Sequence, residues 1–240
     1  LAKKVGLTFV AGASSGSTTF DQNGVQSTGQ IVFGVLRHFN FENQLPVQFT
    51  STVNVLGVFG EATFDYDNFV YVTVSGRNDW VSNLPTENNH QFYPSVSASF
   101  LPTSAFPSLK STNGLNYLKL RAGIGQSAGF PSGYPTVSTV NQTTQVNGGR
   151  IGGTSGLVTN SVSNTLANPN LKPELISEFE AGFDARLWDT RINLSVSYFD
   201  RTTQNLIVDK PLAPSSGFTR TKDNIGKVQG DGWEVDLGVD

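Results

Sequence analysis

Residues 174–201 alternate between apolar and polar side chains on both sides of a short polar break. The apolar positions are Leu175, Phe179, Ala181, Phe183, Ala185 and Leu187 before the break, and Ile192, Leu194, Val196 and Tyr198 after it. The polar positions between them carry Glu178, Glu180, Asp184 and Arg186, and then Asn193, Ser195, Ser197 and Arg201. Because successive side chains of a β-strand point to opposite faces, this period of two predicts two strands, each with one apolar and one polar face.

A turn centred on residues 189–190 would join these two strands in a single register. It would place Phe183 opposite Val196 on the apolar face and Glu178 opposite Arg201 on the polar face. Because like faces then meet along the whole hairpin, the alternation and the turn length agree on the same pairing.

Six other stretches show the same alternation, namely residues 5–13, 53–66, 69–79, 92–101, 117–126 and 228–240. With the hairpin they predict eight strands. Four polar, often glycine-rich stretches are expected to be long loops: residues 14–30, 80–91, 127–172 and 204–225. Residues 67–68, 103–116 and 189–190 are expected to be the connections at the rim of the short turns, and residues 31–41 fit either a short helix or a strand.

Long and short connections therefore alternate along the chain. A soluble β-sandwich has no reason to keep that order, whereas a transmembrane barrel has short turns at one rim and long loops at the other. We expect an all-β fold, an antiparallel transmembrane β-barrel to which this chain contributes about eight consecutive strands. The even-numbered residues of 192–198 would then face lipid and the odd-numbered ones the lumen. A soluble β-sandwich that serves as a binding or adhesion module is the alternative.

The composition excludes several other classes of protein. A net charge of -3 and a pI near 5.4 argue against a nucleic-acid-binding surface, which requires a basic face. The chain has no cysteine, and no apolar run approaches the roughly 20 residues of a transmembrane helix. Its two histidines, His38 and His90, both lie in loop-like stretches of sequence. We therefore expect no enzyme, no catalytic residue, no metal site and no cofactor.

Three aromatic residues of the long loops are the candidate substrate-binding residues: Trp80, Phe130 and Tyr134. Aromatic rings can stack on sugars or grip apolar peptide side chains. Phe130 and Tyr134 each precede a proline, which stiffens the base of a loop, whereas the glycine-rich residues 148–156 are expected to stay mobile. The alternative is that these rings only pack the loops or contact a partner protein. The acidic residues of the polar face are expected to line a water-filled lumen.

Three motifs follow one another at wide spacing. The first is Gly76-Arg77-Asn78-Asp79-Trp80 with Leu84-Pro85, followed by Phe92-Tyr93-Pro94-Ser95-Val96-Ser97. The second is Tyr117-Leu118-Lys119-Leu120-Arg121-Ala122, and the third is Asn168-Pro169-Asn170-Leu171-Lys172-Pro173-Glu174 with Asn224-Ile225-Gly226 downstream. In order and spacing, these motifs resemble the SusC/RagA-type TonB-dependent transporters of Bacteroidetes outer membranes. The resemblance covers roughly residues 53–240 and, more loosely, the first strand.

The resemblance implies a barrel of about 22 strands with a plugged lumen in the outer membrane of a Gram-negative bacterium. Residues 1–240 would be part of one β-barrel domain, with the plug domain and the remaining strands outside this sequence. The implied activity is TonB-dependent import of an oligosaccharide or oligopeptide, with a passive porin as the alternative. The implied partners are a SusD-like surface lipoprotein, the TonB complex through regions absent here, and outer-membrane lipid, but no nucleic acid.

Overall fold

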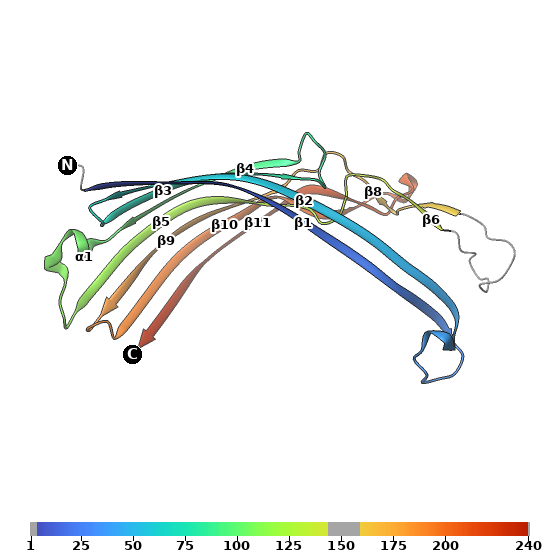
Figure 1. Ribbon diagram of the computed structural model, residues 1–240, viewed down its shortest axis with the longest axis horizontal. Coiled ribbons are helices and arrows are strands. Elements are labelled where there is room, and N and C mark those ends of the chain that lie inside the picture. Colours follow the sequence, from blue (N-terminus) through green and yellow to red (C-terminus); the bar gives the residue numbers. More distant parts are fainter. Residues whose placement is uncertain (1–3, 144–158, 240) are drawn as a thin grey trace.

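The computed structural model describes residues 4–143 and 159–239 and shows a single, strongly curved sheet (Figure 1). The sheet has nine strands in the order β1-β2-β3-β4-β5-β9-β10-β11-β8, and β6 and β7 form a separate small hairpin. Eight of the nine strands are long and antiparallel to their neighbours, whereas β8 is a two-residue strand that runs parallel to β11. The all-β fold and the eight predicted strands are confirmed, and the sheet is part of a larger barrel.

The elements have the following bounds. The long strands are β1 (Val5–Gln30), β2 (Phe41–Tyr66), β3 (Val70–Val81), β4 (His90–Phe100), β5 (Leu115–Gly129), β9 (Glu174–Leu187), β10 (Ile192–Pro211) and β11 (Arg220–Val239). The short strands are β6 (Val140–Thr143), β7 (Thr159–Val162) and β8 (Thr165–Leu166). The helices are η1 (His38–Asn40), α1 (Pro102–Ala105), η2 (Pro107–Leu109) and η3 (Pro214–Ser216). Among the described residues, no helix is long and apolar enough to cross a membrane.

The β9–β10 hairpin has the predicted register. Phe183 pairs with Val196 and Glu178 pairs with Arg201. The backbone N–H of Arg191 donates to the carbonyl oxygen of Trp188 at 3.2 Å, which closes a turn centred on residues 189–190. Both central residues of this turn have positive φ angles, as in the turns that match the twist of a hairpin.

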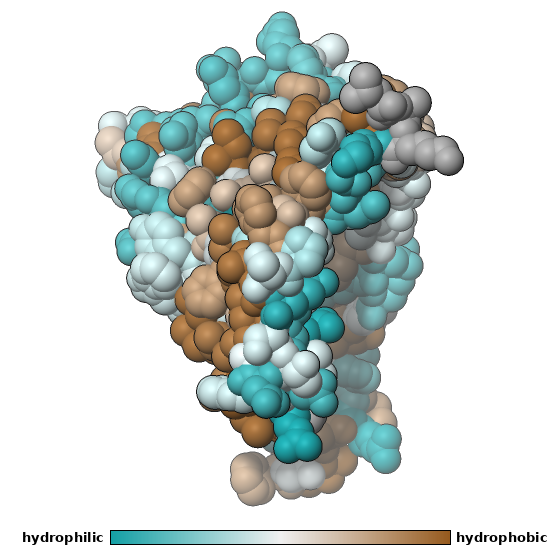
Figure 2. All heavy atoms as spheres, turned by 90° about the vertical axis from the view of Figure 1, so that its left-hand side faces the viewer, coloured by the Kyte–Doolittle hydropathy of each residue, from teal (hydrophilic) through white to brown (hydrophobic). Residues whose placement is uncertain are grey.

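One face of the sheet is apolar and the other is polar, because the register pairs apolar residues with apolar residues from each strand to the next. Val196 on β10 pairs with Phe183 on β9, which pairs with Leu120 on β5, and Leu120 pairs with Phe100 on β4. Many of the apolar side chains on this face are exposed, and seen from the short-turn end they gather in a continuous band flanked by hydrophilic residues (Figure 2). An exposed apolar band on one side of a single sheet is what a lipid-facing barrel wall requires.

Two of the expected loops are largely strand. Residues 14–30 were expected to form a polar loop, but β1 continues through them to Gln30 and pairs with β2. Residues 204–225 were expected to form another loop, but β10 continues to Pro211 and β11 begins at Arg220. In both places the two paired strands satisfy each other's backbone hydrogen bonds, and this pairing does not depend on a clear apolar face.

Residues 31–41 were expected to form a short helix or a strand. Neither of these elements covers the whole segment. It is a turn that contains the 3₁₀ helix η1, and Asn40 is the buried residue that organises it. The Asn40 side-chain amide donates to the carbonyl oxygens of Val32 and Val35 at 2.7 and 2.9 Å. The β1–β2 hairpin that carries this turn continues well past the ends of the neighbouring strands (Figure 1).

Candidate functional site

The polar face of the sheet lines a hollow of about 670 Å³. Arg121 on β5 lines this hollow and is held by groups from β9 and β10. Its guanidinium pairs with the Glu180 carboxylate, lies 3.7 Å from Asp184 and donates to the Ser197 hydroxyl at 2.7 Å. Ser195 in turn donates to Asp184 at 2.8 Å. This network joins β5, β9 and β10 across the polar wall.

A second ionic contact lies further along the same wall, toward the long loops. The Arg201 side chain donates to the Glu178 carboxylate, as the predicted register required. The Arg201 side chain is 59% exposed, so solvent screens this pair and it contributes below about 1 kcal/mol to stability. Its effect is to orient two strands at the base of the loops.

A third polar network sits on β3 and involves the first motif of the sequence. Arg77 Nε lies 3.0 Å from both Asp79 Oδ2 and the Tyr93 hydroxyl, and its Nη2 donates to Ser14 on β1 at 2.8 Å. The Tyr93 hydroxyl also donates to Asp79, which is buried. A Cβ at Gly57 would lie 2.1 Å from Asp79 Oδ1, so the glycine on β2 leaves room for the pair.

At the end of the sheet opposite the short turns, the connections between strands pack around a small apolar core. This core lies on the side of the polar face. Val81, Leu84 and Leu171 are buried there. The partly buried Val55, Phe130 and Ile207 pack against them. Leu171 comes from the third motif and is fully buried. This packing fixes the β3–β4 and β5–β9 connections against one rim of the wall, and we call the six residues the rim cluster.

Hydrogen bonds add to the rim cluster. The Asn83 side chain is almost completely buried and donates to the carbonyl oxygen of Pro131. The Tyr134 hydroxyl donates to the Thr52 carbonyl oxygen at 2.6 Å and lies 3.0 Å from the Ser82 hydroxyl. The segment around residues 130–136 is therefore tied to both β2 and the β3–β4 connection.

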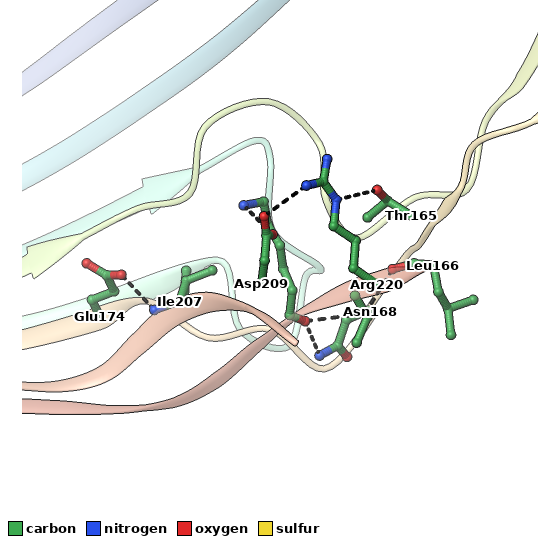
Figure 3. A network of polar contacts seen from close by, with 9 residues as sticks. Thr165, Leu166, Asn168, Glu174, Ile207, Asp209 and Arg220 are labelled. Atoms are coloured by element: carbon green, nitrogen blue, oxygen red, sulfur yellow. Dashed lines mark hydrogen bonds and ion pairs between the residues drawn. The ribbon is translucent and has the colours of Figure 1, made fainter. Parts of the chain in front are cut away.

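The third motif ties the far end of the long connection to the β10–β11 hairpin (Figure 3). Asn168 donates to the Lys222 carbonyl oxygen at 2.9 Å, and the Glu174 carboxylate accepts the Ile207 backbone N–H at 2.7 Å. Figure 3 also shows Asp209 beside Arg220, at 3.3 Å, and the same carboxylate lies 3.2 Å from Lys222. Both ends of the long connection are therefore fixed to the wall.

The three candidate aromatic residues occupy different surroundings. Phe130 belongs to the rim cluster, and Tyr134 is 40% exposed with its hydroxyl bonded as described. Trp80 lies within β3 and not in the loop where we expected it. Since the adjacent Val81 points into the rim cluster, Trp80 points to the opposite, apolar face. Their role in substrate binding stays a prediction, and the glycine-rich residues 148–156 lie outside the described residues.

The Arg121 and Arg77 networks were not singled out from the sequence. The alternation places Arg121 on a polar face, but β5 and β9 become neighbours only across the connection at residues 130–173. The barrel prediction makes these two strands neighbours, but no local pattern predicts the register that places Arg121 opposite Gly182. Within the described ranges, no three His, Asp or Glu side chains converge as a metal site would require.

The sequence profile of TonB-dependent receptor-like β-barrels matches residues 5–240. TonB-dependent receptor P3 of Formosa agariphila is 29% identical over 193 residues, which are 80% of this chain and 19% of that protein. TonB-dependent receptor P26 of the same organism is 26% identical over 190 residues, 78% of this chain and 18% of that protein. This chain therefore spans about a fifth of the length of these relatives.

The fold also matches solved structures. The RagAB peptide transporter matches with a TM-score of 0.80 and 24% identity, over 98% of this chain and 26% of that chain. A mutant of the ferric enterobactin receptor PfeA from Pseudomonas aeruginosa matches with a TM-score of 0.58 and 16% identity, over 96% of this chain and 30% of that chain. At these identities the two likenesses concern the fold.

Proposed function

Because this chain belongs to the TonB-dependent receptor-like β-barrel family, we propose that it forms part of the wall and mouth of an outer-membrane importer. Residues 1–240 are part of one barrel domain in this proposal. The cargo is a nutrient of the oligosaccharide or oligopeptide class, and uptake is driven through the TonB complex.

The observation that carries the proposal is the family match over residues 5–240 of a sheet that has one apolar and one charged face. A soluble β-sandwich would pack the apolar face against a second sheet. Here that face carries exposed side chains such as Ile124, at 60%, and Phe179, at 42%. Lipid covers such a face in a membrane, while the polar face borders the aqueous lumen.

In this proposal, the protein lies in the outer membrane of a Gram-negative bacterium and works with a SusD-like surface lipoprotein that covers its mouth. The rim cluster supports a mouth of fixed shape, because it holds the β3–β4 and β5–β9 connections against one edge of the polar wall. A preorganised mouth loses less conformational entropy when it binds cargo or a partner.

The candidate substrate contacts at this mouth are Trp80, Phe130 and Tyr134. Tyr134 exposes part of its ring while its hydroxyl is fixed, which favours stacking on a sugar or an apolar side chain. Phe130 supports the same segment from the rim cluster, and Trp80 is placed on the opposite face of the sheet. Tyr134 is therefore the first of the three to test.

Uptake by cells that express the full-length protein tests the proposed function. Labelled oligosaccharides and oligopeptides are supplied to cells with and without a functional TonB system. We expect uptake of one of the two classes, and its loss when TonB is absent. Uptake that continues unchanged without TonB would identify a passive porin instead.

The aromatic residues are tested in the same full-length protein. Tyr134→Phe keeps the ring and removes the hydroxyl bonds to Thr52 and Ser82, whereas Tyr134→Ala removes both. Substrate contact predicts that the alanine variant binds cargo more weakly than the phenylalanine variant. Phe130→Ala and Trp80→Ala are measured in parallel, with lipoprotein association determined separately. Unchanged cargo affinity with weakened association would assign these residues to the partner.

A further inference from the structure

The two ends of the long connection between β5 and β9 enclose a small pocket at the long-loop rim. Its volume is about 260 Å³, and its lining residues lie within residues 132–139 and 162–167 and include Lys222 on β11. Pockets that hold a whole small ligand have volumes of roughly 300–1,000 Å³. This pocket therefore fits one unit of a larger cargo.

Hydrogen bonds between these segments hold the walls of the pocket in place. The Asn168 backbone N–H donates to the Pro135 carbonyl oxygen at 3.1 Å, which joins the two ends of the connection. The Thr219 backbone N–H donates to the Asn164 carbonyl oxygen at 2.9 Å, and β8 pairs with the start of β11 beside it. A pocket whose walls are fixed in this way loses little conformational entropy when a ligand binds.

One wall of the pocket presents two hydroxyl groups that can donate hydrogen bonds to a ligand. The Ser163 hydroxyl oxygen accepts the backbone N–H of Thr165 at 3.1 Å. The Thr165 hydroxyl oxygen accepts Nε of Arg220 at 3.3 Å (Figure 3). Among the residues that the structure describes, neither hydroxyl has an acceptor for its own proton. Because a hydroxyl carries one donor besides its acceptor lone pairs, both remain able to donate to a ligand oxygen.

The charges beside this wall are positive in sum. Lys222 lines the pocket, and its Nζ lies 3.2 Å from Oδ1 of Asp209. Arg220 pairs with the other oxygen of the same carboxylate at 3.3 Å, so one negative charge faces two positive charges (Figure 3). No acidic side chain of the described residues lines the pocket. Positive charge beside hydroxyl donors favours a ligand group with a negatively charged oxygen.

Tyr134 forms another part of the lining. Its side chain is partly exposed, and its hydroxyl is fixed by the Thr52 carbonyl oxygen at 2.6 Å. Pro135 and Val137 line the pocket beside it. An aromatic ring held in this way can stack on the apolar face of a sugar. The pocket thus combines a stacking surface with donors for a negatively charged oxygen.

We infer that this pocket binds one acidic sugar unit of the cargo, with the sugar carboxylate at Ser163, Thr165 and Lys222 and the sugar ring against Tyr134. The inference rests on the proposed function and narrows its cargo to an oligosaccharide that carries carboxylates. A peptide carboxylate is commonly captured by successive backbone N–H groups. The donors of this pocket are side-chain hydroxyls beside an aromatic ring, and these match the spaced oxygens of a sugar.

Binding to the full-length protein, purified in detergent, tests this assignment. The probes are the trimers of galacturonate, glucuronate and mannuronate, the same trimers after reduction of their carboxyl groups to alcohols, and the peptide triglutamate. We expect at least one uronate trimer to bind about tenfold more tightly than its reduced counterpart. The reason is that hydrogen bonds to a charged group are stronger than hydrogen bonds to a neutral one.

Matched substitutions locate the binding site. Lys222→Gln removes a charge, and Thr165→Val removes a hydroxyl while it keeps the shape of the side chain. Each is expected to weaken binding of the uronate trimer about tenfold and to change binding of the reduced trimer less. Lys210→Gln is the control, because Lys210 pairs with Asp223 on the same hairpin and is not among the described residues that line the pocket. The heat-modifiable band reports whether each variant is folded, and Thr165→Val gives the answer if Lys222→Gln does not fold.

Four other results would overturn the inference. They are equal affinity for each uronate trimer and its reduced counterpart, an equal loss of affinity in Lys210→Gln and Lys222→Gln, and no binding of any probe. The fourth is binding of triglutamate alone, weakened by Lys222→Gln, which would assign the pocket to an acidic peptide. None of these measurements involves TonB. The uptake experiment on cells with and without TonB therefore distinguishes a wrong pocket assignment from a wrong proposed function.

Discussion

Gly182 lies where the polar wall leaves no space for a side chain. A Cβ at this position would lie 2.5 Å from the carbonyl oxygen of Val196 and 3.2 Å from the Ser197 hydroxyl. The first of these atoms belongs to the backbone of the neighbouring strand and cannot rotate away. The same close approach lets Arg121 reach Ser197 across β9. The glycine is therefore a condition for the Arg121 network.

We predict that Gly182→Ala destabilises the barrel by about 1–3 kcal/mol, because the added methyl group overpacks the contact between β9 and β10. The measurement is the denaturant concentration at which the full-length protein loses its heat-modifiable band. Gly125→Ala on β5 is the matched control, since the atom nearest to a Cβ there, the Ser95 Cβ, lies at an ordinary contact distance of 3.4 Å. Equal midpoints for the two variants would contradict this account of Gly182.

Val196 and Ser195 are neighbours in sequence but point to opposite faces of β10. Val196 lies on the apolar face, opposite Phe183, and Ser195 bonds Asp184 on the polar face. We predict that Val196→Arg costs about 2–4 kcal/mol if it lies near the middle of the bilayer, whereas Ser195→Arg is tolerated beside Asp184. The yield of folded barrel after refolding into lipid measures both effects. A similar loss for the two variants would refute the lipid-facing assignment.

At the scale of elements, the β9–β10 turn joins its two strands in the predicted register, although its residues disfavour the backbone conformation that the turn adopts. Trp188, Asp189 and Thr190 have φ angles of 50°, 57° and 65°. Thr190 is β-branched, and such residues strongly disfavour the left-handed region that glycine adopts freely. The register is set by the alternation on both strands, so the turn adopts this conformation despite its sequence.

We therefore predict that Thr190→Gly stabilises the protein by about 1 kcal/mol, because it removes backbone strain without changing the pairing. Thr202→Gly, in the middle of β10, serves as the comparison and should destabilise, since glycine weakens a strand interior. Unfolding midpoints of the two full-length variants give the test. Destabilisation by Thr190→Gly would indicate that its side chain makes contacts that matter more than the φ angle.

The β1–β2 hairpin shows why sequence reasoning failed for one element. Residues 14–30 are mostly Ser, Thr, Gly, Gln and Asn, which resemble a loop in composition. They form strand because β2 lies opposite them and pairs almost every residue from Thr28 back to Ser14. Apart from glycine, the only apolar residues among them are Phe20 and Val25, which lie on opposite faces, so the alternation that identified the first part of the strand does not continue.

At the scale of the whole molecule, the sheet is open. β1 forms one edge. On the side of β11 that faces away from β10, the only partner within the described residues is the two-residue strand β8, Thr165 and Leu166. Inside hydrocarbon an unpaired strand edge leaves backbone N–H and C=O groups without partners, each at a cost of several kcal/mol. Barrels avoid this cost by closing.

We predict that residues 1–240 expressed alone do not form a stable barrel in detergent. The measurement is heat-modifiable migration together with resistance to protease, and the full-length protein provides the positive control. Failure is expected because the edges of β1 and β11 stay unpaired. A compact, protease-resistant monomer of residues 1–240 would show that these strands can close by themselves.

The sequence by itself determined the features that depend on neighbouring positions along one strand or across one short turn. These are the two faces, the eight long strands, the β9–β10 register with Glu178 beside Arg201, and the motifs that resemble TonB-dependent transporters. Only the tertiary structure decided where the strands end, in which register β5 pairs with β9, and that Leu171 packs with Val81 at the rim. The physical reason is range: a two-residue period is local, whereas pairing across residues 130–173 depends on contacts between segments far apart in the chain.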